Sequence, residues 1–367
     1  MVRSTPNIGL QRSRDSVACV PLKRGVRRHR RAWSEPVLHL IDEMRRFLLT
    51  SLHMLVIAAA LPLAVAGEVK TLGFVSPISS NSAPPPHREA LVKRLRELGW
   101  VEGSNLNIVA RSADGDQTRL PVVAQEVLSK NPDVVLAPGT QAAVAVNRLT
   151  RTVPIVSIMG DPVGTGLVES LARPGRNLTG VSAQNAEEIP GKWIELLREM
   201  LPRLTRVAVI VNPDNALSAR LVARLEDVTK SLRIKVIVLH ASKTEHFAEA
   251  FERAHREAQA VVVMPDAIAL GHRQAIAQLA IKRRIPALYG EAEFVEAGGL
   301  ISFGPDTVAL WRKMADYVDK ILRGAMPATL PIEQPVSFEL AIDFGAAKAI
   351  GMNMPESIRL RANRVTN

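Results

Sequence analysis

From Val69 onward, short apolar runs rich in β-branched residues alternate with amphipathic stretches of helical length, and this alternation restricts the fold most strongly. Strand candidates such as 69–76 (VKTLGFVS) and 206–214 (RVAVIVNPD) are apolar nearly throughout. Strands of that kind are covered on both faces, which is typical of a parallel sheet between layers of helices. The pattern occurs twice in succession, so we predict an α/β protein with two doubly wound, Rossmann-like lobes.

The predicted division places 67–184 and 298–367 in one lobe and 185–297 in the other. Multiple crossings between the lobes would form a hinge, with a cleft between the two lobes. The individual elements follow from the periodicity of apolar residues and from Gly and Pro breaks. Strands are expected at 69–76, 105–113, 133–139, 153–160, 177–182, 206–214, 234–242, 260–266, 285–290, 298–306 and 332–344, with helices at 85–98, 120–129, 140–149, 187–201, 216–232, 245–257, 270–283, 306–324 and 345–352.

Residues 44–66 have the order of a cleavable secretory signal. Arg45 and Arg46 precede an apolar run, and Ala64-Val65-Ala66 provides the small-x-small end after which cleavage would occur. The same apolar run is about the 20 residues that a membrane anchor needs, so an uncleaved anchor is the alternative. The basic extension 1–43 fits neither interpretation, and Met44 is a candidate for the true initiator.

The net charge of +11 is concentrated at the N-terminus. Residues 1–66 carry 11 Lys and Arg against 4 Asp and Glu, which is +7 and leaves +4 for the remaining residues. A body so close to neutral argues against nucleic acid as a partner. The single cysteine, Cys19, precedes the predicted cleavage point, so the exported body would contain neither a thiol nor a disulfide. Export of such a body predicts a periplasmic location.

Four further segments carry a family resemblance: LRELGWVEGSNLNI, DPVGTGLVESLARPGRNLTGVS, GGLISFGPD and the run from Asp316 to Ile358. With them, about residues 69–361 resemble the substrate-binding proteins of ABC transporters with the type I periplasmic-binding fold, in the group related to tryptophan- and tyrosine-binding lipoproteins. The resemblance implies a protein that captures a small solute between its lobes and delivers it to a membrane permease driven by a separate ATPase. Members commonly carry a lipid-anchoring Cys, which this chain lacks after residue 66, so we expect a freely diffusing monomer.

Candidate ligand contacts follow from the rule that open α/β sheets bind ligands beyond the carboxyl ends of their strands. Polar and glycine residues lie at these ends in both halves of the sequence. We predict that the ligand contacts are Ser76, Ser79, Gly139, Thr140, Gly160, Asp161, Ser182, Gln184, Asn212, Asn215, Asp266, Tyr289 and Glu291.

Roles can be suggested for some of these candidates. The backbone N–H groups at Gly139 and Thr140 begin a helix and could hold a carboxylate, although Thr140 could also serve as an N-cap. Asp161 could pair with a ligand ammonium or could start a turn with Pro162. Asp266 could contact the ligand or cap the following helix. The loop at 161–177 is not a dinucleotide fingerprint, since Glu169 stands where its third glycine would be.

These contacts suit an amino acid or a small organic acid better than a sugar, because only 4% of the residues are Phe, Trp or Tyr. Trp100, Trp193 and Trp311 lie on helices or their ends and are expected to be packing residues. No catalytic or metal-binding motif is present in the sequence, and we expect no cofactor. A two-lobed cleft enzyme such as a glycosyltransferase is the alternative, and it would consume its ligand. A DNA-binding regulator would need a helix-turn-helix where the apolar signal lies.

Overall fold

The computed structural model describes residues 40, 42–48, 68–78, 85–182 and 189–367. Residues 1–65 and 66–367 form separate units, and within the first unit residues 42–48 are helical. Most of the predicted signal at 44–66 and two predicted contacts, Ser79 and Gln184, lie outside the described residues. Among the residues that the structure describes, no helix combines the length and the apolarity needed to cross a bilayer.

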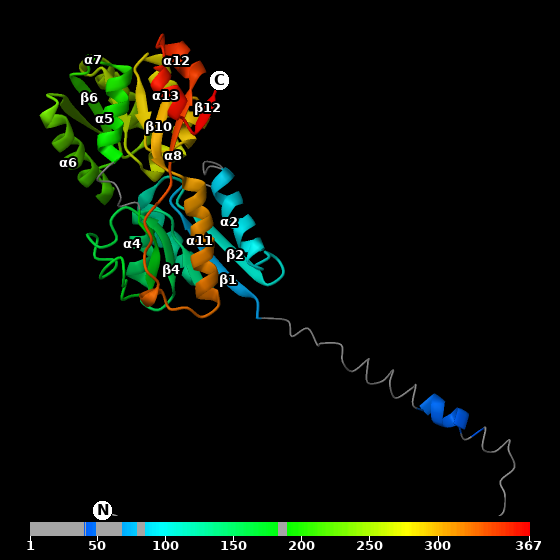
Figure 1. The fold of residues 1–367 in the computed structure, drawn as a ribbon. Helices are drawn as coiled ribbons and strands as arrows, with labels where there is room; N and C mark the ends of the chain where they lie inside the picture. The colour runs from blue at the N-terminus through cyan, green and yellow to red at the C-terminus, as the bar shows by residue number, and fades with distance from the viewer. Residues whose placement is uncertain (1–39, 41, 49–67, 79–84, 183–188) are drawn as a thin grey trace, which may run out of the picture. The chain divides into compact units, whose positions relative to one another are not determined.

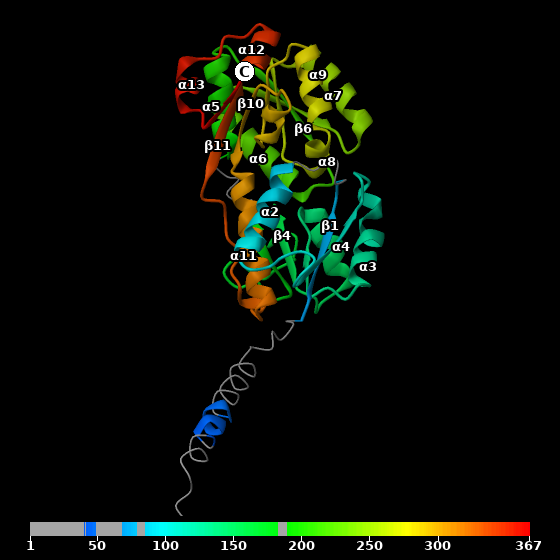
Figure 2. The same cartoon turned by 90° about the vertical axis from the view of Figure 1, so that its right-hand side faces the viewer.

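The second unit contains two sheets, each covered by helices on both faces (Figure 1, Figure 2). Lobe 1 is built on a five-stranded parallel sheet with the order β2-β1-β3-β4-β5. Its strands are β1 (Lys70–Ser76), β2 (Leu106–Ser112), β3 (Val134–Leu136), β4 (Ile155–Met159) and β5 (Leu178–Ser182), and its helices include α2 (Pro85–Glu97), α3 (Leu120–Leu128) and α4 (Thr140–Leu149).

Lobe 2 is built on a seven-stranded sheet with the order β12-β11-β10-β9-β8-β6-β7. Its strands are β6 (Arg206–Val211), β7 (Lys235–His240), β8 (Ala260–Val263), β9 (Ala287–Tyr289), β10 (Ile301–Pro305), β11 (Phe338–Asp343) and β12 (Arg364–Thr366). Its helices are α5 (Ile189–Met200), α6 (Ala216–Ser231), α7 (Thr244–Glu257), α8 (Ala267–Gly271), α9 (Arg273–Lys282), α10 (Glu293–Glu296), α12 (Phe344–Ile350) and α13 (Glu356–Arg361).

The two lobes repeat one topology. In lobe 2 the order β7-β6-β8-β9-β10 corresponds strand for strand to β2-β1-β3-β4-β5 of lobe 1, and all of these neighbours pair in parallel. The structure thus confirms the predicted α/β class with two doubly wound halves. In such a sheet the crevice at the carboxyl ends of the central strands is the ordinary ligand position.

The last seventy residues are divided between the lobes. The prediction assigns all of 298–367 to lobe 1, but β10, β11 and β12 pair in the sheet of lobe 2, where β10 takes the fifth-strand position. Residues 307–333 pack on lobe 1: Ile332 is buried in its core, and α11 (Thr307–Leu322) lies alongside α2 and across β4 and β5 (Figure 1). Its contacts include the hydrogen bond from Arg94 Nε to Asp316 Oδ1 at 2.7 Å.

The helix after each fifth strand therefore belongs to the opposite lobe. The helix after β5 is α5, whose Trp193 and Leu197 are buried in the core of lobe 2, and the helix after β10 is α11, whose Met314 and Val318 are buried in the core of lobe 1. The chain then returns from Glu333 to β11 in lobe 2. Three chain segments thus connect the lobes, which is the arrangement expected of a hinge.

Candidate functional site

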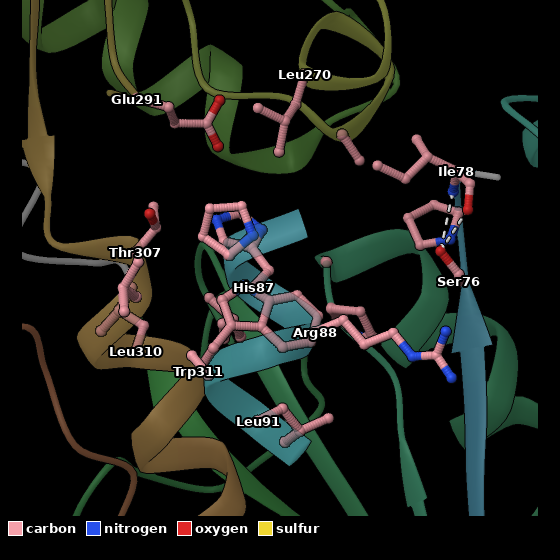
Figure 3. Close-up of a pocket in the computed structure, with 18 of the residues that line it drawn as sticks. Ser76, Ile78, His87, Arg88, Leu91, Leu270, Glu291, Thr307, Leu310 and Trp311 are labelled. Atoms are coloured by element: carbon pink, nitrogen blue, oxygen red, sulfur yellow. Dashed lines mark hydrogen bonds between the residues drawn. The ribbon is translucent and has the colours of Figure 1, made fainter. Parts of the chain in front are cut away.

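A cavity of about 1310 Å³ lies between the lobes, at the carboxyl ends of both sheets. Residues that follow β1, β3 and β4 form part of the wall from lobe 1, and residues that follow β8 and β9 form part of the wall from lobe 2. The helices α2 and α11 complete the lobe 1 side (Figure 3). The volume is ample for a solute of amino-acid size.

The cavity brings together seven of the predicted contacts, from six different strand ends or loops. Each follows a parallel strand, so the shared edge of the sheets explains their convergence. The seven that line the cavity are Ser76, Gly139, Thr140, Gly160, Asn215, Asp266 and Glu291.

Four other candidates do not line the cavity. Asp161 is buried, accepts a hydrogen bond from the Gly164 N–H at 2.7 Å and pairs with Arg220, so it starts the turn that was the alternative interpretation. Ser182 donates to the Gly160 carbonyl at 3.3 Å, and the Asn212 amide donates to Asp266 at 3.1 Å. Tyr289 is fully buried and stacks on Phe294 with ring centroids 4.6 Å apart.

The anion-binding prediction concerns the start of α4. Gly139 precedes this helix with φ of 95°, a conformation that glycine adopts without strain, and no side chain caps the first N–H groups of the helix. The Thr140 hydroxyl accepts a hydrogen bond from the Gly160 N–H at 3.1 Å, so it does not act as the N-cap. The Gly139 N–H is not available to an anion, because it donates to the Ile158 carbonyl at 2.9 Å, but Thr140 and Gln141 also line the cavity, and uncapped N–H groups at a helix start are suited to an anion.

On the side of Gly160, the two lobes touch. The backbone of Gly160 in lobe 1 lies so close to α6 that an added Cβ would be 2.5 Å from the Cβ of Leu217. Nearby, Arg220 of α6 pairs with Asp161, and the Gln141 side chain donates to the Asp214 carbonyl at 3.5 Å. The structure therefore has the lobes closed upon each other at this edge.

A second interlobe contact lies beside the cavity and involves His87 of α2 and Glu293 of α10. His87 Nε2 lies 2.5 Å from Glu293 Oε1, and both side chains are buried. The Thr307 hydroxyl, at the start of α11, donates to the same oxygen. Burial acts to raise the pKa of Glu293, but the contact with His87 and the hydrogen bond from Thr307 outweigh it, and the pKa lies below its ordinary value.

An aromatic and aliphatic surface continues from this pair along lobe 1 (Figure 3). The Trp311 ring stacks on His87 with centroids 5.2 Å apart and an angle of 20° between the planes, and it tilts against Phe74. Leu91, Leu310 and Ile78 extend the apolar lining. The expectation that Trp311 packs is confirmed, because it lies against the core of lobe 1, and it also forms part of the cavity wall. Trp100 lies outside the wall, and its indole N–H donates to Asp319 at 2.8 Å.

The wall on the side of lobe 2 is acidic. Asp266 caps α8, since its Oδ1 accepts from the N–H groups of Ile268 and Ala269 at 2.9 and 3.4 Å. Its Oδ2 accepts from the amides of Asn212 and Asn215, each at 3.1 Å. Burial raises the pKa of Asp266 despite these bonds.

Glu291 is less well satisfied than Asp266. Its Oε2 is shielded from solvent and accepts no hydrogen bond in the described part of the chain. Burial raises the pKa of Glu291 well above its ordinary value of 4.5, and the charges of Glu293 and Asp266 raise it further, while Arg273 opposes them. Burial and the acidic neighbours thus both disfavour ionisation of the Glu291 carboxyl group.

His87, Thr307, Trp311 and Glu293 were missed by the sequence analysis. His87 follows the first strand at the start of a helix, so the strand-end rule that selected Ser76 could also have found it. Trp311 and Thr307 lie at the start of a helix that changes lobes, and only the packing of α11 on lobe 1 places them at the cavity. Within the described residues, no group of three or more His, Cys, Asp or Glu side chains could hold a metal ion.

Two repeated Rossmann-like lobes, three connecting segments and a cavity between them are the architecture of the two-lobed periplasmic-binding-protein fold. The sequence model of the family described as ABC transporter substrate binding protein matches residues 75–366. The chain belongs to this family.

Individual relatives agree with this assignment. A tyrosine-binding protein of Clostridioides difficile is 25% identical over 266 residues, which are 72% of this chain and 76% of the relative. A conserved domain protein from Vibrio cholerae superimposes with a TM-score of 0.76 and 26% identity, covering 82% of this chain and all of that one. The domain of a streptococcal ABC protein in complex with L-Trp has a TM-score of 0.73 and 22% identity, covering 81% and 99% of the two chains.

Proposed function

We propose that this protein captures an aromatic amino acid in the interlobe cavity and delivers it to the permease of an ABC importer. The observation that carries the proposal is the pairing of a flat aromatic surface, Trp311 stacked on His87, with polar groups at the carboxyl ends of both sheets. A ring that lies on Trp311 would gain stacking energy in addition to the burial of its apolar area. The tyrosine-binding relative supports the same class of solute.

Charge complementarity supports a zwitterionic solute. The uncapped start of α4 and the Arg88 side chain offer positive charge from lobe 1, and the acidic wall offers negative charge from lobe 2. A solute held from both sides would stabilise the closed arrangement, because only that arrangement provides all of the contacts at once.

Delivery to a permease implies an extracytoplasmic protein, and we propose the periplasm. The predicted signal at 44–66, with cleavage after Ala66, provides the route. N-terminal sequencing of the protein recovered from the periplasm tests it, because a cleaved protein begins at Gly67.

Calorimetry with L-tyrosine and L-tryptophan tests the proposed ligand class. We expect saturable binding by the mature protein and an increase in melting temperature that grows with solute concentration. Chromatography and mass spectrometry of the same samples should recover the amino acid unchanged. Consumption of the amino acid would favour a cleft enzyme, and binding of sugars but not of either amino acid would refute the proposed class.

A further inference from the structure

The charged side chains of the cavity are segregated by lobe. On the described wall of lobe 2, the charged residues are Asp266 and Glu291, and neither Lys nor Arg lines the cavity there. On lobe 1 the basic residues outnumber the acidic ones: Arg88, Lys93, Arg96, Arg111 and Arg312 line the cavity together with Glu89 and Glu102. A dipolar solute entering this cavity would therefore be oriented with its positive end toward lobe 2.

The carboxyl groups of Asp266 and Glu291, both on the lobe 2 wall, differ in how many hydrogen bonds they accept from the protein. Both Asp266 oxygens already accept hydrogen bonds from the protein, from two backbone N–H groups and two Asn amides. Glu291 Oε2 has no donor among the described residues, although it is removed from solvent. A buried carboxyl oxygen without a partner is costly, so a solute that donates a hydrogen bond to it would remove that cost.

The position of Glu291 determines which solute can do so. Its side chain extends from the loop after β9 toward His87, beside Leu270 and above the aromatic surface (Figure 3). The carboxyl groups of Glu293 and Asp266 act on Glu291 more strongly than the opposing charge of Arg273, so its surroundings are electrostatically negative. An anion would be repelled there, and a neutral hydroxyl would gain only an uncharged hydrogen bond. A protonated amine supplies both a donor and the opposite charge.

We propose that Glu291 is the acceptor for a cationic nitrogen of the solute, so that the cavity selects amines, with or without a carboxylate, over acids of the same shape. The inference rests on the proposed function and deepens it by naming the group that is recognised. It also assigns to Glu291 the pairing with a ligand ammonium that the sequence suggested for Asp161. The Asp161 carboxylate pairs with Arg220 instead.

Three probes with one phenol ring separate the contributions: L-tyrosine, tyramine, which lacks the carboxylate, and 3-(4-hydroxyphenyl)propionate, which lacks the amine. Each is titrated calorimetrically into the mature wild-type protein, Glu291→Gln and the control Glu89→Gln. The control makes the same substitution in the same cavity, at an exposed residue on the opposite lobe. Melting curves establish that both variants are folded.

In the wild-type protein we expect tyramine to bind, and the propionate to bind at least about 30-fold more weakly than tyrosine, as for loss of a buried charge partner. Glu291→Gln should lower the affinity for tyrosine and tyramine by at least about tenfold and reduce the difference between tyrosine and the propionate. Glu89→Gln should leave all three affinities within about threefold of wild type. Equal binding of tyrosine and the propionate by the wild type, or unchanged tyrosine affinity in Glu291→Gln, would overturn the inference.

If the proposed ligand class is wrong, the titrations give a different result from the one expected if only the role of Glu291 is wrong. If the wild-type protein binds none of the three probes, the aromatic amino acid is wrong, and the solute that mass spectrometry recovers from the purified protein replaces them. A recovered solute with a basic nitrogen, lost from Glu291→Gln but retained by Glu89→Gln, would support the role of Glu291. A recovered solute without a basic nitrogen, or a wild-type protein that no amine stabilises, would refute it.

Discussion

Replacing Gly160 with alanine should impair closure of the two lobes without impairing the folding of either lobe. Gly160 follows β4 in lobe 1, and its backbone lies against Leu217 of α6 in lobe 2. In Gly160→Ala the new Cβ would meet Leu217 Cβ at 2.5 Å, Cγ at 3.0 Å and Cδ2 at 3.1 Å. Carbon atoms pack best at about 3.5 to 4.0 Å, so the closed arrangement lacks about 1.0 to 1.5 Å of space at this contact.

The cost of that overlap should appear in the closed state alone. Excess methylene groups in a packed site cost about 1 to 3 kcal/mol, and an interlobe contact can avoid this cost by opening. If the solute binds only when the lobes close, the apparent affinity should fall by the same free energy, about 5- to 150-fold. The melting temperature of the empty protein should change little, because each lobe keeps its own core.

Titration of L-tyrosine by calorimetry measures the affinity, and small-angle X-ray scattering reports whether the empty variant is more open. Leu217→Gly is the compensating change. Alanine would not suffice, because the nearest atom is the Cβ of Leu217 itself. The double variant Gly160→Ala, Leu217→Gly should recover most of the lost affinity. Wild-type affinity in Gly160→Ala, or no recovery in the double variant, would refute the interpretation that this contact limits closure.

Three further predictions concern the cavity and its rim. Trp311→Ala should lower the affinity for L-tyrosine by about tenfold or more in calorimetry, through loss of stacking and burial, whereas Trp100→Ala, outside the cavity, should leave it unchanged. Glu291→Gln should stabilise the empty protein against urea at pH 7: the raised pKa of Glu291 makes wild-type stability fall as pH rises above 4.5, by at most about 3 kcal/mol at pH 7, so the difference should vanish near pH 4. An equal difference in stability between the variant and the wild type at pH 7 and pH 4 would contradict the raised pKa of Glu291. Arg220→Gln should weaken tyrosine binding by less than about fivefold, because Arg220 is half exposed, and the effect should shrink in high salt; a salt-independent loss would show that the pair with Asp161 is not electrostatic.

The sequence predicted the sheets better than it predicted the division of the chain between them. Apolar runs such as β6 and β8 are readable because a strand buried on both faces has a continuous apolar sequence. The place of β10 depends on its pairing with β9 in parallel and β11 in antiparallel orientation, and local sequence does not encode which partner a strand finds. Short elements such as α10 and β12 were missed because they are stabilised by their contacts rather than by periodicity.

Prediction of the site has the same limit: local sequence identifies residues at strand ends, but it does not identify contacts between distant parts of the chain. Residues that directly follow a parallel strand, such as Thr140 and Glu291, could be found because the sheet edge collects them. Asp161 follows the same rule but does not line the cavity, and its carboxylate pairs with Arg220, which is 59 residues away along the chain. His87 and Glu293 are 206 residues apart and meet only when the lobes approach each other. Contacts of that kind depend on the arrangement of the two lobes, which no single strand–helix unit specifies.

The closed arrangement therefore combines two kinds of interlobe contact with different purposes. The Asp161 and Arg220 pair and the His87, Glu293 and Thr307 cluster join side chains of the protein directly. The Glu291 oxygen, by contrast, gains a partner only when a donor enters the cavity. Because Glu291 Oε2 has no donor within the described residues, a solute that donates to it across the cavity would lower the free energy of the closed arrangement relative to the open one.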